Sequence, residues 1–583
     1  MNWDDLDYVF NTRDIDSGIS GEQIKHWFSR NYLGNYQPLP IFTYALDHVI
    51  GGTNPLVYHL DNLLWHIAAT LLVYCFINML QDNKWVAFFV ALLFAIHPVQ
   101  TESVSWIAAR NKSMNAVFYF SAMCFYISYV KTRSKTKLVL VTLCGLLAYL
   151  CKATALALPL ALIAADIWLL RPLNTRKIWL EKLPLVLAGI PVAMVTLAAQ
   201  KDINFLQHHA GFGWSTIVYA GYALVQYLIH LILPFQLSVL YPYPKAVTFA
   251  HTLYLIPAVG MVTLMLIAYR KGWRILAGGI LFFIVNLLPV LQLVQFGETL
   301  MADRYLYIAC VGLWFTLVYH LFRMFEMNCW PIAAGISSTA CGFFLVMTFF
   351  RNTIWLNQIN FWSSVIDKFP ESAVAQYSLG AAYMKEGNLK SAELHIKKAV
   401  QYDPRNYKAW FNKGSLNMRQ GKAMEALDAL NKSIQLYPYS KAYFTRAMLY
   451  HSMHRLSLAM DDVNRVLEQQ PNNARAYYIK ADCEERLGKP GKAMDDYNKA
   501  ILFDNREPLF LIRRGLLLAA NGNKQAAFSD LDKAVALNSA NGESFYYRGL
   551  IRYSLGQNPC EDLYQALRNG NSKAGEMMRK ICK

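Results

Sequence analysis

The sequence lacks the features that mark several common classes of protein. Its ten cysteines show no Cys-x-x-Cys spacing or other metal-binding pattern, and seven of them precede residue 351, where a thiol packs as a small apolar group. No secretory signal peptide is visible at the polar start of the chain. The net charge of +17 is dispersed and carries no nucleic-acid-binding signature. We therefore expect neither a cysteine-built metal domain nor a nucleic-acid partner.

Charge is also scarce. Only 16% of the residues are charged and 55% are hydrophobic, a balance that fits neither an ordinary globular protein nor a pure transporter. The pattern changes near Arg351: long apolar segments with short basic or aromatic loops precede it, and a helical repeat follows it. The sequence therefore predicts an all-α chain, a polytopic membrane helical bundle followed by an α-solenoid, each with its own core.

The membrane half contains eleven apolar windows between residues 56 and 350 that are long enough, or nearly long enough, to cross a bilayer. Basic loops at 131–137, 171–182 and 270–274 predict the cytoplasmic side. All three loops fall on the cytoplasmic side only if the window 214–234 does not cross the membrane. Glycines and prolines flank this window, as is typical of a re-entrant or interfacial helix. We predict ten spans in 56–350, with residues 1–55 and the repeats on the non-cytoplasmic side.

The second half repeats a unit of about 34 residues, the period of tetratricopeptide (TPR) repeats. Gly380, Ala392 and Pro404 stand at positions 8, 20 and 32 of one unit, and Gly414 and Ala426 recur in the next. Small residues at the first two positions allow two helices to approach, and the proline ends the second helix. We expect a linker at 351–371 and a TPR domain at 372–583, with five to six repeats and a capping helix.

The repeats have two possible roles. Their groove would hold a protein or peptide acceptor or a partner protein, or the array would only scaffold the membrane half. Cys560 and Cys582 flank the final helical pair and would be able to form a disulfide if that end faces an oxidising compartment.

The segments predicted on the non-cytoplasmic side combine carboxylates, imidazoles and arginines, which are costly near a membrane unless they have a function. The candidates are Asp4, Asp5, Tyr36, His97, Glu102, Arg110, Asp303, Arg304 and Tyr305. Simpler roles are open for each. Two adjacent aspartates often form a solvated turn, His97 before a proline caps a helix end, and Arg304 pairs with Asp303 or reaches the membrane interface.

Several motifs together resemble one family. They are Asn35-Tyr-Gln-Pro-Leu, Tyr58-His-Leu-Asp-Asn with His66, Leu93-Phe-Ala-Ile-His-Pro with Glu102 and Arg110, Cys151-Lys152, and Asp303-Arg-Tyr-Leu-Tyr. In this order, and followed by TPR repeats, they resemble the transmembrane and TPR repeat-containing O-mannosyltransferases, which are type C glycosyltransferases. The resemblance covers nearly the whole chain.

The resemblance implies transfer of a sugar, mannose in the characterised relatives, from a polyprenyl-phosphate donor to Ser or Thr hydroxyls on the non-cytoplasmic side. Asp4 and Asp5 occupy the place of the family's acidic pair, where a carboxylate takes the proton of the attacking hydroxyl. We expect Glu102 as a further acid. The donor's phosphate would meet Arg304, Arg110 and Lys152, and the substrate would contact His97, Tyr36 and Tyr305. A single displacement would invert the anomeric carbon.

Two departures from the family stand out. Relatives have a membrane span before the acidic pair, and this chain shows none, so we expect either a misassigned start at Met1 or a missing first span. Ala153 follows Lys152 where relatives usually carry an acid, which leaves the partner of Lys152 open.

The sequence leaves the sugar and the divalent metal requirement open and indicates no certain cofactor besides the donor substrate. The absence of a retention tail at Ile581–Lys583 favours a bacterial inner membrane over an endoplasmic reticulum. Two alternatives to the protein transferase are a related enzyme that glycosylates a lipid or an envelope glycan, and a non-catalytic TPR membrane scaffold.

Overall fold

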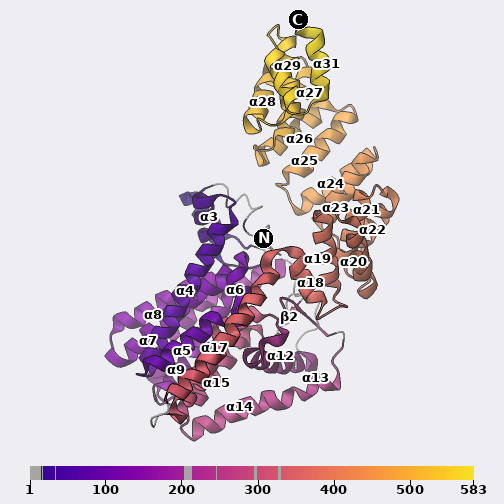
Figure 1. Ribbon diagram of the computed structural model, residues 1–583. Coiled ribbons are helices and arrows are strands. Elements are labelled where there is room, and N and C mark those ends of the chain that lie inside the picture. The colour runs from indigo at the N-terminus through magenta and orange to yellow at the C-terminus, as the bar shows by residue number, and fades with distance from the viewer. Residues whose placement is uncertain are drawn as a thin grey trace. The chain divides into compact units, whose positions relative to one another are not determined.

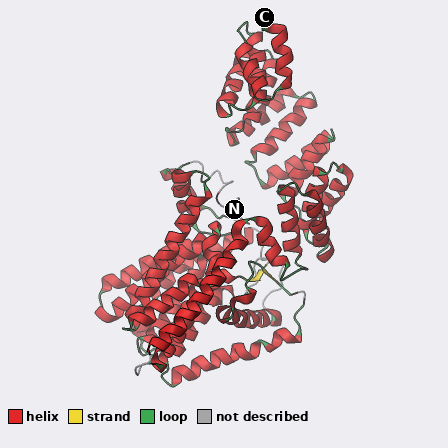
Figure 2. Ribbon diagram, in the orientation of Figure 1, coloured by secondary structure: helices red, strands yellow, loops and turns green. Residues whose placement is uncertain are grey.

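The structure of the chain, a computed structural model, describes residues 5, 9, 15, 18–32, 34–202, 213–244, 246–293, 299–325 and 330–582. Two compact units make up the chain, Met1–Pro370 and Glu371–Lys583. Both are built from helices, which confirms the expected all-α architecture (Figures 1 and 2).

The first unit is a helical bundle with one short ribbon of two strands. Its α-helices are α2 (Gly21–Ser29), α3 (Pro38–Gly51), α4 (Pro55–Leu80), α5 (Lys84–Ile96), α6 (Thr101–Ser105), α7 (Arg110–Thr132), α8 (Lys135–Cys151), α9 (Leu158–Trp168), α10 (Arg176–Leu180), α11 (Leu183–Asp202), α12 (Trp214–Ile232), α13 (Phe249–Leu253), α14 (Leu255–Arg270), α15 (Arg274–Leu287), α16 (Leu306–Met324), α17 (Trp330–Asn352) and α18 (Gln358–Ile366). Its 3₁₀ turns are η2 (Pro98–Gln100), η3 (Ile107–Ala109), η4 (Ala153–Ala157), η5 (Pro234–Gln236), η6 (Leu288–Val290), η7 (Asp303–Tyr305) and η8 (Thr353–Leu356). Strands β1 (Tyr241–Pro242) and β2 (Thr299–Met301) pair antiparallel, with Tyr241 opposite Met301.

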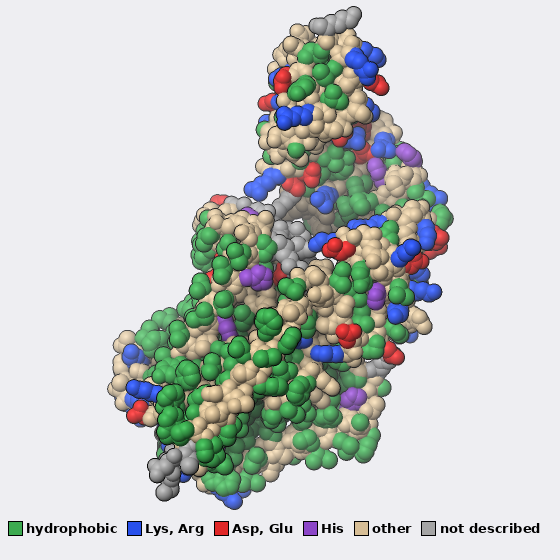
Figure 3. All heavy atoms as spheres, viewed as in Figure 1, with side chains coloured by type: hydrophobic (Ala, Val, Ile, Leu, Met, Phe, Trp, Pro, Cys, Tyr) green, Lys and Arg blue, Asp and Glu red, His purple; other side chains and the backbone are tan. Residues whose placement is uncertain are grey.

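Aromatic side chains fill the centre of this bundle. The ring of Phe76 on α4 lies 5.7 Å from that of Phe120 on α7 and 6.0 Å from that of Trp168 on α9, and all three residues are buried. Such contacts hold the helices together where lipid gives no hydrophobic drive between them. On the face that Figure 3 shows, hydrophobic side chains cover much of the surface of this unit. The bundle thus turns apolar groups both inward and toward lipid.

Six helical segments in the described part of this unit are long and apolar enough to cross a membrane. A seventh results if α5 and the η2–α6 segment, which meet at His97 with a bend of 51°, count as one span. The unit is therefore a multi-pass membrane domain. The segment Trp214–Ile232, which the loop charges predict to be re-entrant, is one of the six. Its re-entry and the total of ten spans stay predictions, because α8, α9 and α15 are apolar but shorter than a full span.

The segment predicted as a linker, 351–371, contains η8 and α18. Arg351 is buried and donates from Nη1 to the carbonyl of Leu237 at 2.7 Å and from Nη2 to Asp303 at 3.2 Å. Phe361 and Trp362 on α18 are buried as well. These residues belong to the first unit, and the boundary between the units falls at Pro370 and Glu371.

The second unit consists of helix pairs in series. Its helices are α19 (Ala373–Lys385), α20 (Leu389–Tyr402), α21 (Tyr407–Arg419), α22 (Ala423–Leu436), α23 (Ser440–Ser452), α24 (Leu456–Gln469), α25 (Ala474–Arg486), α26 (Pro490–Phe503), α27 (Pro508–Ala520), α28 (Lys524–Leu537), α29 (Gly542–Ser554), α30 (Cys560–Arg568) and α31 (Ser572–Ile581). Glycine is required where paired helices approach closely: a Cβ on Gly380 would lie 2.5 Å from Ile396, and one on Gly414 would lie 2.7 Å from Leu430. The predicted small positions therefore act as expected for TPR repeats.

A ladder of ion pairs, which the sequence analysis missed, runs through the later repeats. Basic residues recur every 34 residues on the first helix of each pair, and each meets an aspartate on the second helix. The pairs are Arg446–Asp462 (2.6 Å), Lys480–Asp496 (3.1 Å), Arg514–Asp530 (2.7 Å) and Arg548–Asp562 (2.7 Å). The three arginines also donate to the preceding repeat, at Asn431, Asn498 and Asp532 respectively. The ladder therefore links neighbouring repeats.

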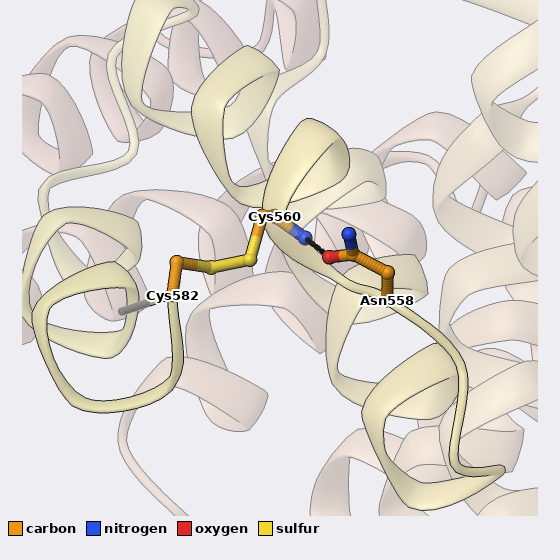
Figure 4. The surroundings of a disulfide bond; sticks show 3 residues. All are labelled: Asn558, Cys560 and Cys582. Carbon is orange, nitrogen blue, oxygen red and sulfur yellow. Dashed lines mark hydrogen bonds between the residues drawn. A yellow bond between two sulfur atoms is a disulfide. The ribbon is translucent and has the colours of Figure 1, made fainter.

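A disulfide joins Cys560, the first residue of α30, to Cys582, just after α31 (Figure 4). The two Cα atoms are 5.7 Å apart, a normal separation for a disulfide. The bridge that the sequence left open is therefore present, and it fastens the closing helix of the solenoid to the last pair.

Candidate active site

A narrow cavity that opens partly to solvent lies inside the membrane unit. Its lining residues are Lys112, Asn115, Thr154, Asn286, Val290, Arg304, Tyr305, Tyr307 and Ile308. They come from α7, α15, α16 and the turns η4, η6 and η7, so the polar loops and the membrane helices both contribute. The cavity combines cationic groups with apolar walls, which suits a ligand that has a charged head and an apolar tail.

Arg304, a predicted phosphate ligand, is bound to Glu102, a predicted acid. The backbone N–H of Arg304 donates to Glu102 Oε2 at 2.9 Å, and its guanidinium donates to Oε1. The guanidinium also lies over the rings of Trp106, at 5.4 Å, and Tyr305, at 5.2 Å, within the range of cation–π attraction. Both oxygens of the buried Glu102 carboxylate are therefore engaged, and its charge offsets that of Arg304.

Two lysines add positive charge at the same cavity. Lys112, the third residue of α7, is only 5% exposed, and its ammonium lies 4.8 Å from the ring centre of Tyr305. Lys152 lies between α8 and η4, next to the lining residues, and donates to Asn35 Oδ1 at 3.2 Å. Burial, and after it the positive charge of Arg304, lowers the pKa of Lys152 to about 8. The described hydrogen-bond partner of Lys152 is therefore an amide and not an acid.

Arg110, the third predicted phosphate ligand, is committed to the protein. It is fully buried and forms ion pairs with Asp47 at 2.5 Å and Asp61 at 2.9 Å. Its Nε also donates to Asn62 Oδ1 at 2.7 Å, and its Nη2 donates to the carbonyl of Tyr58 at 3.0 Å. Arg110 does not appear among the residues that line the cavity. The described contacts make it a clamp between α3, α4 and α7.

Of the predicted acidic pair, Asp5 is described and Asp4 lies outside the described residues. Asp5 is 2% exposed, and its Oδ1 accepts a hydrogen bond from the backbone N–H of Ala108 at 3.0 Å. Ala108 belongs to η3, two residues from both Trp106 and Arg110. The carboxylate is thus fixed beside the loop that supplies Glu102.

The three predicted substrate contacts lie in different surroundings. Tyr305 lines the cavity, between the cations of Lys112 and Arg304. His97 is fully buried: its Nε2 hydrogen-bonds the carbonyl of Leu231 at 3.0 Å, and its Nδ1 accepts from the N–H of Val99 at 3.3 Å. The hydroxyl of Tyr36 donates to the carbonyl of Phe28 at 3.1 Å. Only Tyr305 faces the cavity.

The histidines of α4 offer no metal site. His66 hydrogen-bonds through Nδ1 to the hydroxyl of Tyr307 at 2.6 Å and through Nε2 to the carbonyl of Ala95 at 3.0 Å. Among the residues that the structure describes, no group of three or more His, Cys, Asp or Glu side chains could hold a metal ion. The metal requirement of the reaction stays open.

Lys112 and Asn115 were not predicted from the sequence. Their spacing would have indicated a shared site, because residues three apart lie on one face of a helix. Both residues also follow directly on a loop rich in polar residues. The buried Oδ1 of Asn115 has no hydrogen-bond partner within the described part of the chain. A lysine at the start of a span usually reaches toward the membrane surface, so Lys112 was not counted among the candidate site residues.

Comparison with known proteins gives matches to both halves of the chain. A tetratricopeptide repeat family model matches residues 377–441 and 444–508. The protein O-mannosyl-transferase F38B6.6 of Caenorhabditis elegans is 25% identical over 398 residues, 65% of this chain and 56% of the relative. Human protein O-mannosyl-transferase TMTC3 is 20% identical over 637 residues, 95% of this chain and 68% of the relative. Drosophila melanogaster Tmtc1 is 33% identical over 123 residues, 21% of this chain and only 14% of the relative.

Among solved structures, the TPR protein YrrB matches with 17% identity and a TM-score of 0.28, over 32% of this chain and 97% of that chain. The matched segments span 14%, 56% and 68% of the three curated relatives. Across its membrane and repeat halves, the chain is similar to proteins named protein O-mannosyl-transferases, and its second half matches the tetratricopeptide repeat model.

Proposed function

We propose that this chain is a membrane glycosyltransferase that moves a mannose-like sugar from a polyprenyl-phosphate donor to Ser or Thr hydroxyls of proteins on the non-cytoplasmic face. The observation that carries the proposal is the cavity where Lys112 and Arg304 meet the apolar side chains of Val290 and Ile308. A polyprenyl-phosphate sugar has the same combination of an anionic head and an apolar chain. The names of the matched relatives support the reaction class.

In the proposed reaction Asp5, with Asp4, accepts the proton of the acceptor hydroxyl. The hydroxyl oxygen forms a bond to the anomeric carbon while the bond from that carbon to the phosphate oxygen breaks, and polyprenyl phosphate leaves with the electron pair. The hydrogen bond from Ala108 holds the Asp5 carboxylate in place for this role. A single displacement inverts the anomeric configuration.

The remaining predicted residues take roles that follow from their contacts. Lys152 contributes charge toward the donor's phosphate, and Glu102 directs the guanidinium of Arg304. Tyr305 contacts the donor in the cavity. His97 and Arg110 hold the surrounding helices through their buried hydrogen bonds, and Tyr36 fixes the N-terminal segment through its hydrogen bond to Phe28.

We further propose that the repeats bind the acceptor protein or a partner on the same, non-cytoplasmic side. The Cys560–Cys582 disulfide supports this placement, because such bonds form and persist in oxidising compartments. The preference for a bacterial inner membrane over an endoplasmic reticulum stays a prediction, and the matched relatives, which are animal proteins, give it no support.

The test is transfer by the purified full chain in lipid nanodiscs. Polyprenyl-phosphate mannose and peptides rich in Ser and Thr are supplied, and peptide mass is measured with wild type, Asp4→Asn and Asp5→Asn. We expect a gain of one hexose per modified site with wild type and its loss in the variants. Transfer to lipid or glycan but never to peptide would favour the alternative enzyme. No transfer from any polyprenyl-phosphate sugar, with both variants behaving as wild type in cells, would leave only the scaffold.

A further inference from the structure

Lys112 is a buried lysine that no carboxylate pairs with in the described part of the membrane unit. Its side chain is nine-tenths or more buried, it lines the cavity, and within the described part of the chain its ammonium has neither a hydrogen bond nor an ion pair. Its ammonium lies 4.8 Å from the centre of the Tyr305 ring, within the range of cation–π attraction. An ammonium taken out of water without an anion is costly, and a bound anion would offset that cost.

The carboxylates around the cavity are already occupied. Glu102 binds the backbone and the guanidinium of Arg304. Asp303 accepts from the hydroxyl of Tyr241 at 2.7 Å and pairs with Arg351. The carboxylates of Asp47 and Asp61 are both bound to Arg110, outside the lining of the cavity. In the described part of the chain, each of these four acids pairs with an arginine and none forms an ion pair with Lys112.

Asn115 provides a second, independent sign that this cavity is a binding site. It lies one turn beyond Lys112 on the same face of α7 and lines the same cavity. Its buried Oδ1 accepts no hydrogen bond within the described part of the chain. A buried acceptor without a donor is uncommon, and a sugar hydroxyl is a donor of the right kind. An ammonium for a phosphate and an amide oxygen for a hydroxyl together match a glycosyl phosphate.

The charges also distinguish the bound donor from the leaving group. Arg304 is offset by Glu102, which leaves Lys112 and Lys152 as two uncompensated cations. A polyprenyl-phosphate sugar carries one negative charge, whereas the departing polyprenyl phosphate approaches a charge of about −1.5 to −2. Two cations therefore stabilise the developing leaving group more than the bound donor, which lowers the barrier.

We propose that Lys112 is the ligand of the donor's phosphate, with Asn115 receiving a hydroxyl of the sugar, and that Arg304 is a positioning residue held by Glu102. This inference rests on the proposed function and names the groups that carry out donor recognition. Phosphate binding, which the sequence predicted for Arg304, is thereby assigned to Lys112 on α7.

Binding of farnesyl phosphate by the full chain in nanodiscs tests the assignment, with farnesol as the neutral lipid of the same length. We expect Lys112→Met to weaken farnesyl phosphate binding at least tenfold and to leave farnesol binding unchanged. The same variant should keep or raise the thermal midpoint of the ligand-free protein, because it removes an unpaired buried charge. Lys135→Met, at the exposed start of α8, is the matched control and should bind as wild type does.

A double variant sharpens the test. Glu102→Gln releases the charge of Arg304, so Glu102→Gln with Lys112→Met should recover part of the affinity that Lys112→Met loses. Equal farnesyl phosphate binding by wild type and Lys112→Met would overturn this inference and leave the proposed function standing. Equal losses for farnesol and farnesyl phosphate, with a lower thermal midpoint, would also overturn it by showing a structural role. A wild-type chain that binds no farnesyl phosphate would overturn both proposals.

Discussion

Arg304 donates its backbone N–H, at 2.9 Å, and its guanidinium to one carboxylate, that of Glu102, which lies 202 residues earlier in the chain. The two hydrogen bonds join the turn before α16 to the short helix α6 and fix the direction of the arginine at the edge of the cavity. The pair therefore closes the site by linking two loops that the sequence separates widely.

Glu102→Gln should destabilise the membrane unit. The change leaves the guanidinium of Arg304 buried beside a neutral amide, and removal of one partner of a buried ion pair costs about 3–5 kcal/mol. The thermal midpoint in nanodiscs should fall accordingly. The double variant Glu102→Gln with Arg304→Met should be more stable than the sum of the single changes predicts, because the two residues interact directly. Additive losses would show that the pair contributes nothing to stability.

Asp5→Asn should abolish most of the transfer without weakening donor binding. A general base contributes about 10²–10⁴-fold to a rate, and the amide cannot accept the proton. The amide oxygen keeps the hydrogen bond from Ala108, so the fold should persist. The measurement is kcat alongside the affinity for farnesyl phosphate. Glu22 is an exposed acid on α2, so Glu22→Gln is the control and should transfer as wild type does. A similar loss of transfer in both variants would contradict a role of Asp5 as the base.

Donor affinity should decline as the pH rises through about 8. Lys152 has its pKa lowered to about 8 by burial and by the charge of Arg304, so it is cationic below that pH and neutral above it. Loss of this charge weakens attraction for a phosphate, and the KM for the donor should rise. Lys152→Arg stays charged at all accessible pH values, so its KM should rise less over the same range. A wild-type profile as flat as that of the variant would contradict a role for Lys152 in binding.

The repeats were predictable because their information is local. Gly380 and Ala392 face each other within a single helix pair. Because small residues recur at these positions in successive repeats, the sequence alone predicts the close approach of the two helices. Arg110 shows the opposite case. It is a plausible phosphate ligand by sequence, yet in the fold it meets Asp47 and Asp61, about 50 to 60 residues away, and no sequence pattern reveals which carboxylate a buried arginine will find.

Lys112 shows why the site was only partly predicted. Its sequence neighbourhood indicates a helix start near the membrane surface. Only the fold shows that Lys112 is buried without an acid to pair with, and this is why it is proposed as a ligand. Arg304, Tyr305 and Lys152 were predicted through motifs, whereas the ion-pair ladder of the repeats depends on register between helices and was not.

The ladder makes a prediction about stability in the repeats. Arg514→Ala leaves the buried carboxylate of Asp530 without its cation and breaks the hydrogen bond to Asn498 of the preceding repeat. We expect a loss of about 1–3 kcal/mol. The exposed pair of Arg465 and Glu468 is the control, since surface pairs contribute about 0–1 kcal/mol. Hydrogen exchange of α27 and α28 in the full chain measures the difference, and equal protection in Arg514→Ala and Arg465→Ala would refute a stabilising ladder.

The Cys560–Cys582 disulfide links stability to the side of the membrane on which the repeats lie. The bridge joins residues that are 22 apart in the sequence. By restricting the unfolded chain, a loop of this length stabilises the folded state by about 3 kcal/mol. Paired replacement of both cysteines by serine should therefore loosen α30 and α31, which raises their hydrogen exchange while α19 and α20 stay protected. In cells, Cys560 should resist a thiol reagent until a reductant is added, because a non-cytoplasmic compartment keeps the bond oxidised. Cys483, buried in α25, should resist the reagent in the folded protein both before and after mild reduction. Labelling of Cys560 in untreated cells would place the end of the repeats in a reducing compartment and would contradict the predicted topology together with the disulfide.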